Sequence, residues 1–324
     1  MLFTSSRANT TDNLYTIAFY NLENLFDIRI NDQILDEDFT PNGIKKWTPK
    51  RYGKKIVNLG RAISRIGEKF NRHPPVLIGL SEVENELVLN DLINTESLKK
   101  HSYGFVHFNS PDERGIDTAL LYRKNFFNVL HTEAIPLKVF SLEGVVDRTR
   151  DILYVLGQLN GEEVHLFINH WPSRRDGDVA TAYKRIEAAD TIKEFMTELE
   201  KTHTDPNYIV MGDFNDDPSS ESIKNLVSSK QLYNPMEKMH TPFRGSAQYK
   251  RRWNLFDQII VSHNFFNFEK GTHSFAHANI FDEHFLKEGK GRYKGSPLRT
   301  FVGNKYKGGY SDHFPVYIQL KYNE

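Results

Sequence analysis

The segment 211–218 constrains the fold more than any other part of the chain, because a buried strand must end inside it. Residues 207–210 are Asn-Tyr-Ile-Val, which predicts a short buried strand. The apolar run stops at Gly212, and Asp213, Asn215 and two further aspartates follow. Carboxylates held close together repel each other unless a cation or a protonated group relieves them. The segment is therefore either a polar turn after a strand or part of a site, and these residues alone leave both open.

Charge and cysteine content limit what such a site can bind. The chain of 324 residues has 42 basic and 42 acidic side chains, a balance that argues against a protein held to nucleic acid by its overall charge. A local basic patch can still bind a polyanion. There is no cysteine, so any metal must be held by oxygen or imidazole ligands, which favours hard cations such as Mg²⁺, Mn²⁺ or Ca²⁺.

The length suits one large or two small domains, and because no linker is found a single domain over residues 1–324 is expected, with residues 1–12 disordered. The hydrophobic fraction of 39% is enough to fill a sizeable core. No apolar run has the length of a membrane span, and the polar start lacks the apolar centre of a signal peptide. The default expectation is a cytoplasmic protein, with a mature exported protein as the alternative.

Strands and helices are expected along the whole chain. Apolar and aromatic runs predict strands at 14–20, 76–80, 103–108, 117–122, 152–159, 163–168, 207–210, 256–261 and 316–320. Helical spacing of apolar residues predicts helices at 51–70, 85–98, 179–199 and 221–227. Asn160-Gly161 predicts a hairpin, whereas 28–49 is expected to be a loop and 265–309 has no clear pattern. Mixed sheets with helices outside them are the natural arrangement.

Polar groups follow five of these strands. They are Asn21 and Glu23, Glu82 and Glu84, Asn169 and His170, Asp213 and Asn215, and Asp312 and His313. One such pair is typical of a turn, but five of them indicate that several strands end at the opening of one pocket. Oxygen ligands and two histidines can hold a hard cation, position water and hydrogen-bond an oxyanion.

These five motifs, in this order, resemble the endonuclease/exonuclease/phosphatase (deoxyribonuclease-I-like) superfamily. The segments are 21–24 (Asn-Leu-Glu-Asn), 81–83 (Ser-Glu-Val), 169–173 (Asn-His-Trp-Pro-Ser), 212–215 (Gly-Asp-Phe-Asn) and 311–313 (Ser-Asp-His). The resemblance is greatest to an uncharacterised bacterial branch with an Asn-Leu-Glu-Asn-Leu-Phe start. It implies an α+β fold, a four-layer α/β/β/α sandwich of two mixed sheets with outer helices, and metal-dependent hydrolysis of phosphoesters.

The resemblance also implies a metal site and its ligands. Asn21 and Glu82 match the family's metal-site residues, Glu82 as a direct ligand and Asn21 as a ligand or orienting group. Asp312 matches the last carboxylate near the same ion. The implied cofactor is Mg²⁺ or Mn²⁺, with Ca²⁺ as an alternative.

The catalytic groups follow from the same matches. Asp213 matches the residue that orients or deprotonates the attacking water, with Asn215 beside it, and His170 and His313 match the two histidines that grip the phosphate. Each histidine is a donor to a developing oxyanion, and one is a candidate general acid.

Two further carboxylates resemble partners of those histidines. Asp257 resembles the carboxylate that hydrogen-bonds His313, and Asp117 resembles the acidic partner of His170. Such partners fix a tautomer and stabilise the imidazolium.

Basic residues near these motifs have two interpretations. Arg174 and Arg175 closely follow His170 and are either solvated charges or contacts to substrate phosphate. The segment 287–307 carries seven lysines and arginines among aromatic residues. It is either a soluble loop or a groove for a polyanion and stacked bases.

Three functions are compatible with these residues. The first expectation is a divalent-metal-dependent nuclease, an endonuclease acting by in-line water attack on nucleic acid. The alternative is a phosphoesterase on a small or lipid phosphate, of the inositol phosphate or sphingomyelin type, which the neutral charge favours. A binding module with a dead site is the weakest, because every matched core position holds a chemically competent residue.

Overall fold

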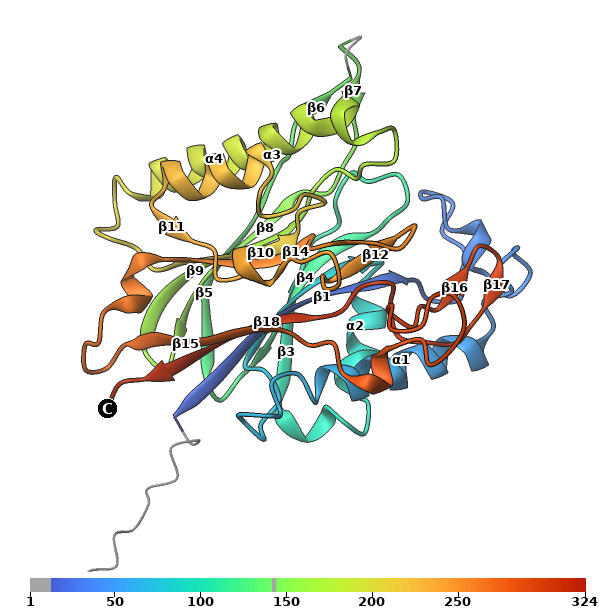
Figure 1. The fold of residues 1–324 in the computed structure, drawn as a ribbon, viewed down its shortest axis with the longest axis horizontal. Helices are drawn as coiled ribbons and strands as arrows, with labels where there is room; N and C mark the ends of the chain where they lie inside the picture. The colour runs from blue at the N-terminus through green and yellow to red at the C-terminus, as the bar shows by residue number, and fades with distance from the viewer. Residues whose placement is uncertain (1–12, 142–143) are drawn as a thin grey trace, which may run out of the picture.

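The structure is a computed structural model that describes residues 13–141 and 144–324. The disorder expected for residues 1–12 lies outside these residues. Two six-stranded sheets lie face to face, and helices cover their outer faces (Figure 1). The four-layer α/β/β/α sandwich of mixed sheets is therefore confirmed. In the described part of the chain, no helix has the length and hydropathy needed to cross a membrane.

The first sheet has the order β15-β18-β1-β2-β4-β3. Its strands are β1 (Leu14–Leu25), β2 (Leu77–Val83), β3 (Tyr103–His107), β4 (Asp117–Arg123), β15 (His273–Ile280) and β18 (Val316–Tyr322). β1 and β2 are parallel, and the other pairs are antiparallel. The carboxyl ends of β1 and β2 therefore lie at the same edge of this sheet.

The second sheet has the order β11-β14-β10-β9-β8-β5. Its strands are β5 (Phe127–Ile135), β8 (Ile152–Leu159), β9 (Glu162–His170), β10 (Tyr208–Asp213), β11 (Leu232–Tyr233) and β14 (Asp257–Ser262). Here β9 and β10 are the parallel pair. Asn160 and Gly161, with φ of 50° and 93°, form the expected hairpin turn between β8 and β9.

Four α-helices occur in the described residues, and each packs one face against a sheet. They are α1 (Pro49–Ile63), α2 (Glu86–Ile93), α3 (Asp178–Leu199) and α4 (Glu221–Ser229). α1 and α2 contribute to the core that includes the first sheet, and α3 and α4 pack on the second. The Asn85 side chain accepts a hydrogen bond from Val88 N at 3.1 Å, so it caps α2.

Short elements fill the segments that the sequence left unassigned. The strands are β6 (Val139–Phe140), β7 (Val146–Asp147), β12 (Ala247–Tyr249), β13 (Arg252–Asn254), β16 (Phe301–Val302) and β17 (Lys305–Tyr306). The 3₁₀ turns are η1 (Glu37–Phe39), η2 (Lys99–His101), η3 (Glu237–Met239), η4 (His263–Phe266) and η5 (His284–Leu286). The long segment 265–309 thus supplies an edge strand, β15, followed by a loop with its own small hairpin.

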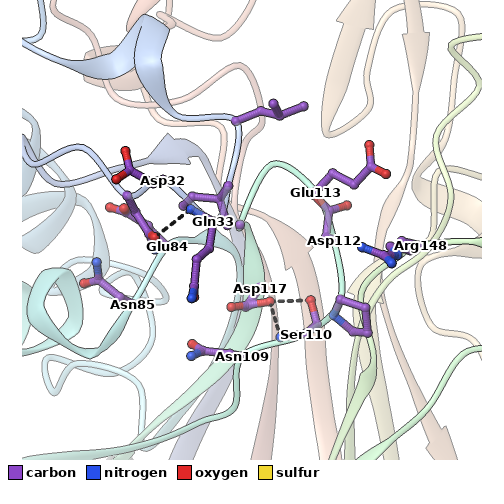
Figure 2. A pocket seen from close by; sticks show the side chains of 15 residues that line it. Asp32, Gln33, Glu84, Asn85, Asn109, Ser110, Asp112, Glu113, Asp117 and Arg148 are labelled. Atoms are coloured by element: carbon purple, nitrogen blue, oxygen red, sulfur yellow. Dashed lines mark hydrogen bonds between the residues drawn. The ribbon is translucent and has the colours of Figure 1, made fainter.

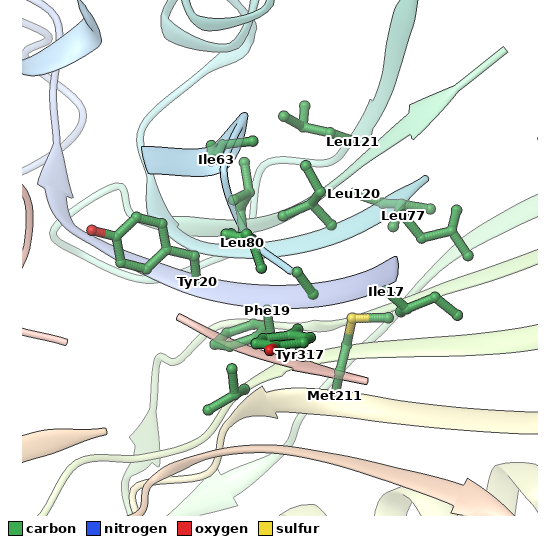
Figure 3. Close-up of a cluster of buried hydrophobic side chains, with 14 of the residues drawn as sticks. Ile17, Phe19, Tyr20, Ile63, Leu77, Leu80, Leu120, Leu121, Met211 and Tyr317 are labelled. Carbon is green, nitrogen blue, oxygen red and sulfur yellow. The ribbon is translucent and has the colours of Figure 1, made fainter. Parts of the chain in front are cut away.

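The core between the sheets packs the two parallel pairs against each other. Phe19 of β1 and Met211 of β10 are fully buried and meet between the layers (Figure 3). A Cβ added at Gly79 of β2 would lie 2.7 Å from Met211 Sδ, so only glycine fits at this point of closest approach. Tight packing here fixes the positions of the strand ends that carry the polar motifs.

Candidate active site

The strand ends that carry the polar motifs meet at one edge of the sandwich. Asp213, the last residue of β10, lies opposite His170 of β9 on one side and Asp257 of β14 on the other. In the first sheet, the register pairs Asn21 of β1 with Ser81 of β2. The two sheets therefore present their functional ends to each other, as the recurring pattern predicted.

Local backbone irregularity directs these side chains. Glu82 has φ of 62° and Asn215 has φ of 49°, both in the left-handed region. The β2–β4 register shifts between Ser81 and Val83, which is a bulge at Glu82. Bulges re-aim a side chain at the end of a strand, and backbone strain of this kind is concentrated at functional sites.

Gly212 permits the close approach of β9 and β10 just before the site. A Cβ added there would lie 2.5 Å from Asn169 Cβ and 2.6 Å from its carbonyl oxygen. Asn169 in turn donates from Nδ2 to Met211 O at 3.2 Å and accepts from Trp171 Nε1 at 3.1 Å. This buried network holds the ends of the two strands at a fixed spacing.

Asp213 is at the centre of the site and is almost completely buried. Its Oδ2 accepts from Asn21 Nδ2 at 3.0 Å, and its Oδ1 accepts from Asn215 N at 3.0 Å. Burial raises its pKa to about 6, with the nearby His313 opposing the shift and Asp257 adding to it. Asn215 Nδ2 donates to Trp171 O at 3.0 Å, which leaves Oδ1 as an acceptor. A carboxylate and an amide oxygen are thus available to a water molecule.

His313 lies between two carboxylates. Its Nδ1 lies 2.6 Å from Asp257 Oδ2, and its Nε2 lies 4.0 Å from Asp213 Oδ2. Burial alone would lower its pKa, but Asp257 and Asp213 hold that pKa well above the ordinary histidine value. His313 is therefore an imidazolium at neutral pH and can donate a hydrogen bond or a proton.

His170 has the opposite charge state. Its Nε2 lies 3.8 Å from Asp213 Oδ2 and 3.9 Å from Glu82 Oε1. Burial, followed by the nearby Arg150 and other cations, lowers its pKa well below the ordinary value, so the ring is neutral. One site thus holds one charged and one neutral histidine.

The expected pairing of Asp117 with His170 is wrong. Asp117 accepts from Ser110 N at 2.9 Å and from the Ser110 hydroxyl, and it lies 3.3 Å from His107 Nε2. His170 Nδ1 is buried and has no hydrogen-bond partner among the described residues. Asp117 begins β4 opposite Val83, so the register directs its carboxylate to the loop before β4.

Of the residues expected to hold a divalent cation, Glu82 and Asp312 keep an oxygen atom free for it, whereas Asn21 Oδ1 already accepts from Glu23 N at 2.9 Å and offers only its second lone pair. Glu82 Oε2 accepts from Asn24 N at 2.7 Å, and no described group hydrogen-bonds to Oε1. Asp312 pairs through Oδ2 with Arg299, and no side chain of the described residues hydrogen-bonds to its Oδ1. Lone pairs of carboxylate and amide oxygens suit a hard cation, so Glu82, Asp312 and Asn21 fit such an ion. The identity of the metal does not follow from this set.

A second set of groups in the site also has metal-like spacing. Ligand atoms of Asp213, Asp257 and His313 lie within 4.8 Å of one another. Here the protonated His313 already supplies the positive charge between two carboxylates. We therefore interpret this triad as a proton-transfer group in which the imidazolium offsets part of the carboxylate charge, and not as the cation site.

A buried arginine that the sequence analysis missed supports the end of β9. Arg150 donates to His170 O at 3.2 Å and to Trp171 O at 2.7 Å, and its Nη1 lies 3.0 Å from Asp112 Oδ2. No motif identified it, because its partners lie 20 to 38 positions away in the sequence.

A second missed network lies beside Asp312. Glu23 is buried and accepts from Phe301 N at 3.2 Å. Lys55 Nζ lies 4.0 Å from Glu23 Oε2 and donates to Tyr310 O at 2.6 Å. Burial raises the pKa of Glu23 to about 7 and lowers that of Lys55 to about 8. This network ties the loop before Asp312 to the end of β1.

The two arginines after His170 differ. Arg174 donates to Asn215 O at 2.7 Å and pairs with Asp216 at 2.7 Å and Asp178 at 3.0 Å. It is therefore committed to holding the loop after β10. Arg175 is exposed, and no described residue pairs with its side chain.

Comparisons with known proteins agree with this geometry. Residues 16–322 match the endonuclease/exonuclease/phosphatase family. No curated protein sequence matches the chain. Among solved structures, a family protein from Bacteroides thetaiotaomicron has a TM-score of 0.60 and 18% identity, covering 95% of each chain.

Two other solved structures have names that mention a substrate or a product. A mannosyl-6-phosphatase from Bacteroides thetaiotaomicron has a TM-score of 0.59 and 18% identity, covering 95% of this chain and 100% of its own. D. rerio TDP2 in complex with a single-strand DNA product has a TM-score of 0.55 and 16% identity, covering 96% of this chain and 100% of its own. At these identities the likeness shows a shared fold alone.

Proposed function

The chain belongs to the endonuclease/exonuclease/phosphatase family and is a metal-dependent phosphoester hydrolase, and on that premise we propose that it acts by in-line attack of water held on Asp213 and Asn215. The observation that carries this proposal is the contact of Asp213 with Asn21, Asn215, His170 and His313 at one sheet edge. Each of these residues was expected in the site from its place after a strand.

Each residue has a distinct role in this mechanism. Asp213 takes the proton of the attacking water, and the free amide oxygen of Asn215 orients that water. The charged His313 donates to the leaving oxygen, and the neutral His170 donates to a phosphoryl oxygen. A divalent cation held by Glu82, Asn21 and Asp312 would supply further neutralisation of the phosphoryl charge.

A chromogenic phosphoester tests this proposal directly. We expect hydrolysis with Mg²⁺ or Mn²⁺, none with a chelator, and a loss of about a hundredfold or more in kcat for Asp213→Asn. Asp176→Asn is the matched control, because Asp176 is an exposed carboxylate outside the site. Full activity of Asp213→Asn would overturn the mechanism.

Two substrate classes are compatible with this chemistry, and nucleic acid is the one first expected. Arg175 and the exposed Lys290, Arg292 and Lys294 support it. Other basic residues of the loop are neutralised within the protein, since Lys287 pairs with Asp282 at 2.8 Å and Lys307 with Glu288 at 3.1 Å.

The aromatic residues of the same loop also favour a structural role. Phe301 packs edge-on against Phe39 and lies 5.7 Å from Trp47, and Arg51 stacks on Tyr306. Phe301 is buried and Tyr306 is half-buried, whereas Tyr293 of the same loop is 48% exposed. A platform for stacked bases needs exposed rings, so the packing of Phe301 and Tyr306 weakens the nuclease proposal and leaves Tyr293 as the exposed ring among these three.

A cavity beside the site favours the alternative, a small phosphoester with a hydroxyl-rich alcohol. It has a volume of about 550 Å³, a size that suits a small ligand. Its acidic and amide lining includes Asp32, Glu84, Asn85, Asn109, Glu113 and Asp117, with Arg148 on one side (Figure 2). Carboxylates and amides hydrogen-bond hydroxyl groups well, and the carboxylates repel the flanking phosphates of a polynucleotide.

The place of this cavity connects it to the chemistry. Glu84 follows Glu82 by two residues, and Asp117 lies opposite Val83 in the β2–β4 register. Asp112 in the lining binds Arg150, whose guanidinium holds the carbonyls of His170 and Trp171. An alcohol bound in the cavity would therefore lie next to the end of β9, where His170 is proposed to bind a phosphoryl oxygen.

The names of structural neighbours agree with both classes. One is a mannosyl-6-phosphatase, and another was solved with a single-strand DNA product. The fold therefore does not choose between them, and the lining of the cavity carries the argument.

A side-by-side substrate panel separates the two classes. We expect a sugar phosphate or inositol phosphate to be hydrolysed faster than DNA or RNA at the same Mg²⁺ concentration. Asn109→Ala removes an exposed amide of the lining and should raise KM for the sugar phosphate without changing hydrolysis of a simple aryl phosphate. Salt-sensitive cleavage of DNA or RNA with no turnover of small phosphates would favour the nuclease instead.

A further inference from the structure

A group of two histidines and a glutamate lies on the second sheet, away from the active site. Glu163 and His165 alternate on β9 and therefore point to the same face, and His203 follows the end of α3. One ligand atom from each residue lies within 4.8 Å of the other two. His165 is five residues from His170 along β9, which places it about 16 Å from the end of the strand.

His165 is oriented by a partner on its other ring nitrogen. Its Nδ1 lies 2.8 Å from the hydroxyl of Tyr154, a neighbour on β8. Its Nε2 lies 3.8 Å from Glu163 Oε1 and makes no hydrogen bond with the described residues. The ring is buried, so its orientation is fixed by packing as well as by this contact.

His203 has the same arrangement. Its Nδ1 lies 3.2 Å from Leu199 O and 3.0 Å from Thr202 Oγ1, and its Nε2 is unpaired within the described part of the chain. Donation of Nδ1–H to a carbonyl leaves Nε2 as a lone-pair donor. In metal sites, a ligating histidine usually donates its other ring N–H to a carbonyl, a carboxylate or water in this way.

We propose that Glu163, His165 and His203 form a binding site for a transition-metal ion, with Zn²⁺ as the expected ligand. Two imidazoles and one carboxylate are a ligand set typical of Zn²⁺, and they differ from the oxygen-only set of the active site. Ligand atoms 2.0–2.1 Å from a tetrahedral Zn²⁺ lie about 3.3 Å from one another. The distances between the three ligand atoms must therefore shorten by roughly 1.5 Å or less when the ion binds. The exposed side chain of Glu163 and the half-buried ring of His203 must make this movement together.

A bound ion would join the end of α3 to the middle of β9. The rings of His165 and His203 already lie edge to face with centroids 5.0 Å apart, and Tyr208 packs beside them at 5.5 Å. If these residues serve only as an aromatic cluster, metal will not stabilise the protein. If they form a site, Zn²⁺ will raise the unfolding temperature, because it binds the folded chain.

The test uses the full chain without a polyhistidine tag, stripped of metal and kept in excess Mg²⁺. We expect titration with Zn²⁺ to show one site per chain with Kd below about 10 µM. Co²⁺ should give the visible absorption of a tetrahedral site. His203→Ala should weaken Zn²⁺ binding at least about tenfold and remove the thermal shift. Glu163→Gln should weaken it as well.

Controls separate this site from the active site and from adventitious binding. His263→Ala is the matched variant, since His263 is an exposed histidine on η4 outside the triad, and it should bind Zn²⁺ normally. Glu82→Gln, which removes an expected ligand of the catalytic cation, should also retain it. Zn²⁺ binding that is absent, or that survives His203→Ala but is lost in His313→Ala, would overturn the proposal.

Discussion

His313 Nδ1 lies 2.6 Å from Asp257 Oδ2, and this contact joins the loop before β18 to the first residue of β14. β14 and the strand that follows His313 belong to different sheets, so the contact forms only when both sheets have packed. It fixes the imidazole ring with Nε2 toward Asp213, 4.0 Å away. The charge of Asp257, together with that of Asp213, thereby favours the protonated form of His313.

Asp257→Asn tests that relationship. The substitution keeps the shape of the side chain but removes the charge that raises the pKa of His313. We expect kcat to fall by about a hundredfold or more at pH 8, with a smaller loss at pH 6, where His313 is more easily protonated. The measurement is the pH dependence of kcat, with Asp205→Asn at an exposed turn as the control. An equal loss at both pH values would contradict the prediction.

The raised pKa of the buried Asp213 predicts that kcat/KM falls at acidic pH. Burial raises its pKa to about 6, and only the ionised form can accept a proton from water. The ionised fraction grows as pH rises, so kcat/KM should rise with pH and level off above about 6. A bound cation favours the carboxylate and shifts this fall to lower pH. Rate measurements from about pH 4.5 to 8 check this. The residual activity of Asp213→Asn should lack this fall at acidic pH.

Much of this site could be predicted because its residues stand immediately after strands. Asp213 and His170 each end an apolar run, and in a sheet with parallel neighbours such ends must share one edge. The hairpin at Asn160-Gly161 was equally predictable, because the turn needs two positive φ values. Local sequence determines these features almost completely.

The features that the sequence did not predict depend on pairing between distant segments of the chain. Asp117 was expected in the site from the family resemblance, but it begins β4 and lies beside Ser110 and His107 instead of His170. Arg150 stands in no recognisable motif, since its importance comes from three partners brought to it by the sheet. β5 was missed because its alternating exposure places few apolar residues in a row.

Arg150→Met should destabilise the protein more than most substitutions. It removes donors to His170 O and Trp171 O and leaves Asp112 buried without its main counter-charge. Breaking a buried ion pair in this way costs about 3–5 kcal/mol. Denaturant unfolding measures the loss, and Arg148→Met is the matched control, because Arg148 is exposed and should change stability by less than about 0.5 kcal/mol. Similar stability of the two variants would contradict a structural role for Arg150.

Arg299 provides a test of the cation site, because it binds the carboxylate expected to hold the metal. Its Nη2 donates to Asp312 Oδ2, and its Nε lies 3.6 Å from Glu23 Oε1. Burial would raise the pKa of Asp312, but His313, Arg299 and Lys55 hold it below the ordinary value. A guanidinium and a divalent cation therefore compete for the same negative charge.

Arg299→Gln should consequently tighten Mg²⁺ binding by on the order of tenfold, a change of about 1.4 kcal/mol. The measurement is the Mg²⁺ concentration that gives half-maximal rate, supported by calorimetric titration of the metal-free protein. Lys305→Gln removes an exposed charge of the same loop and should leave this concentration within about twofold. Weaker Mg²⁺ binding in Arg299→Gln would contradict this prediction and mean that Arg299 positions Asp312 for the ion. A carboxylate that loses its orientation binds metal less well, even though its negative charge is fully available.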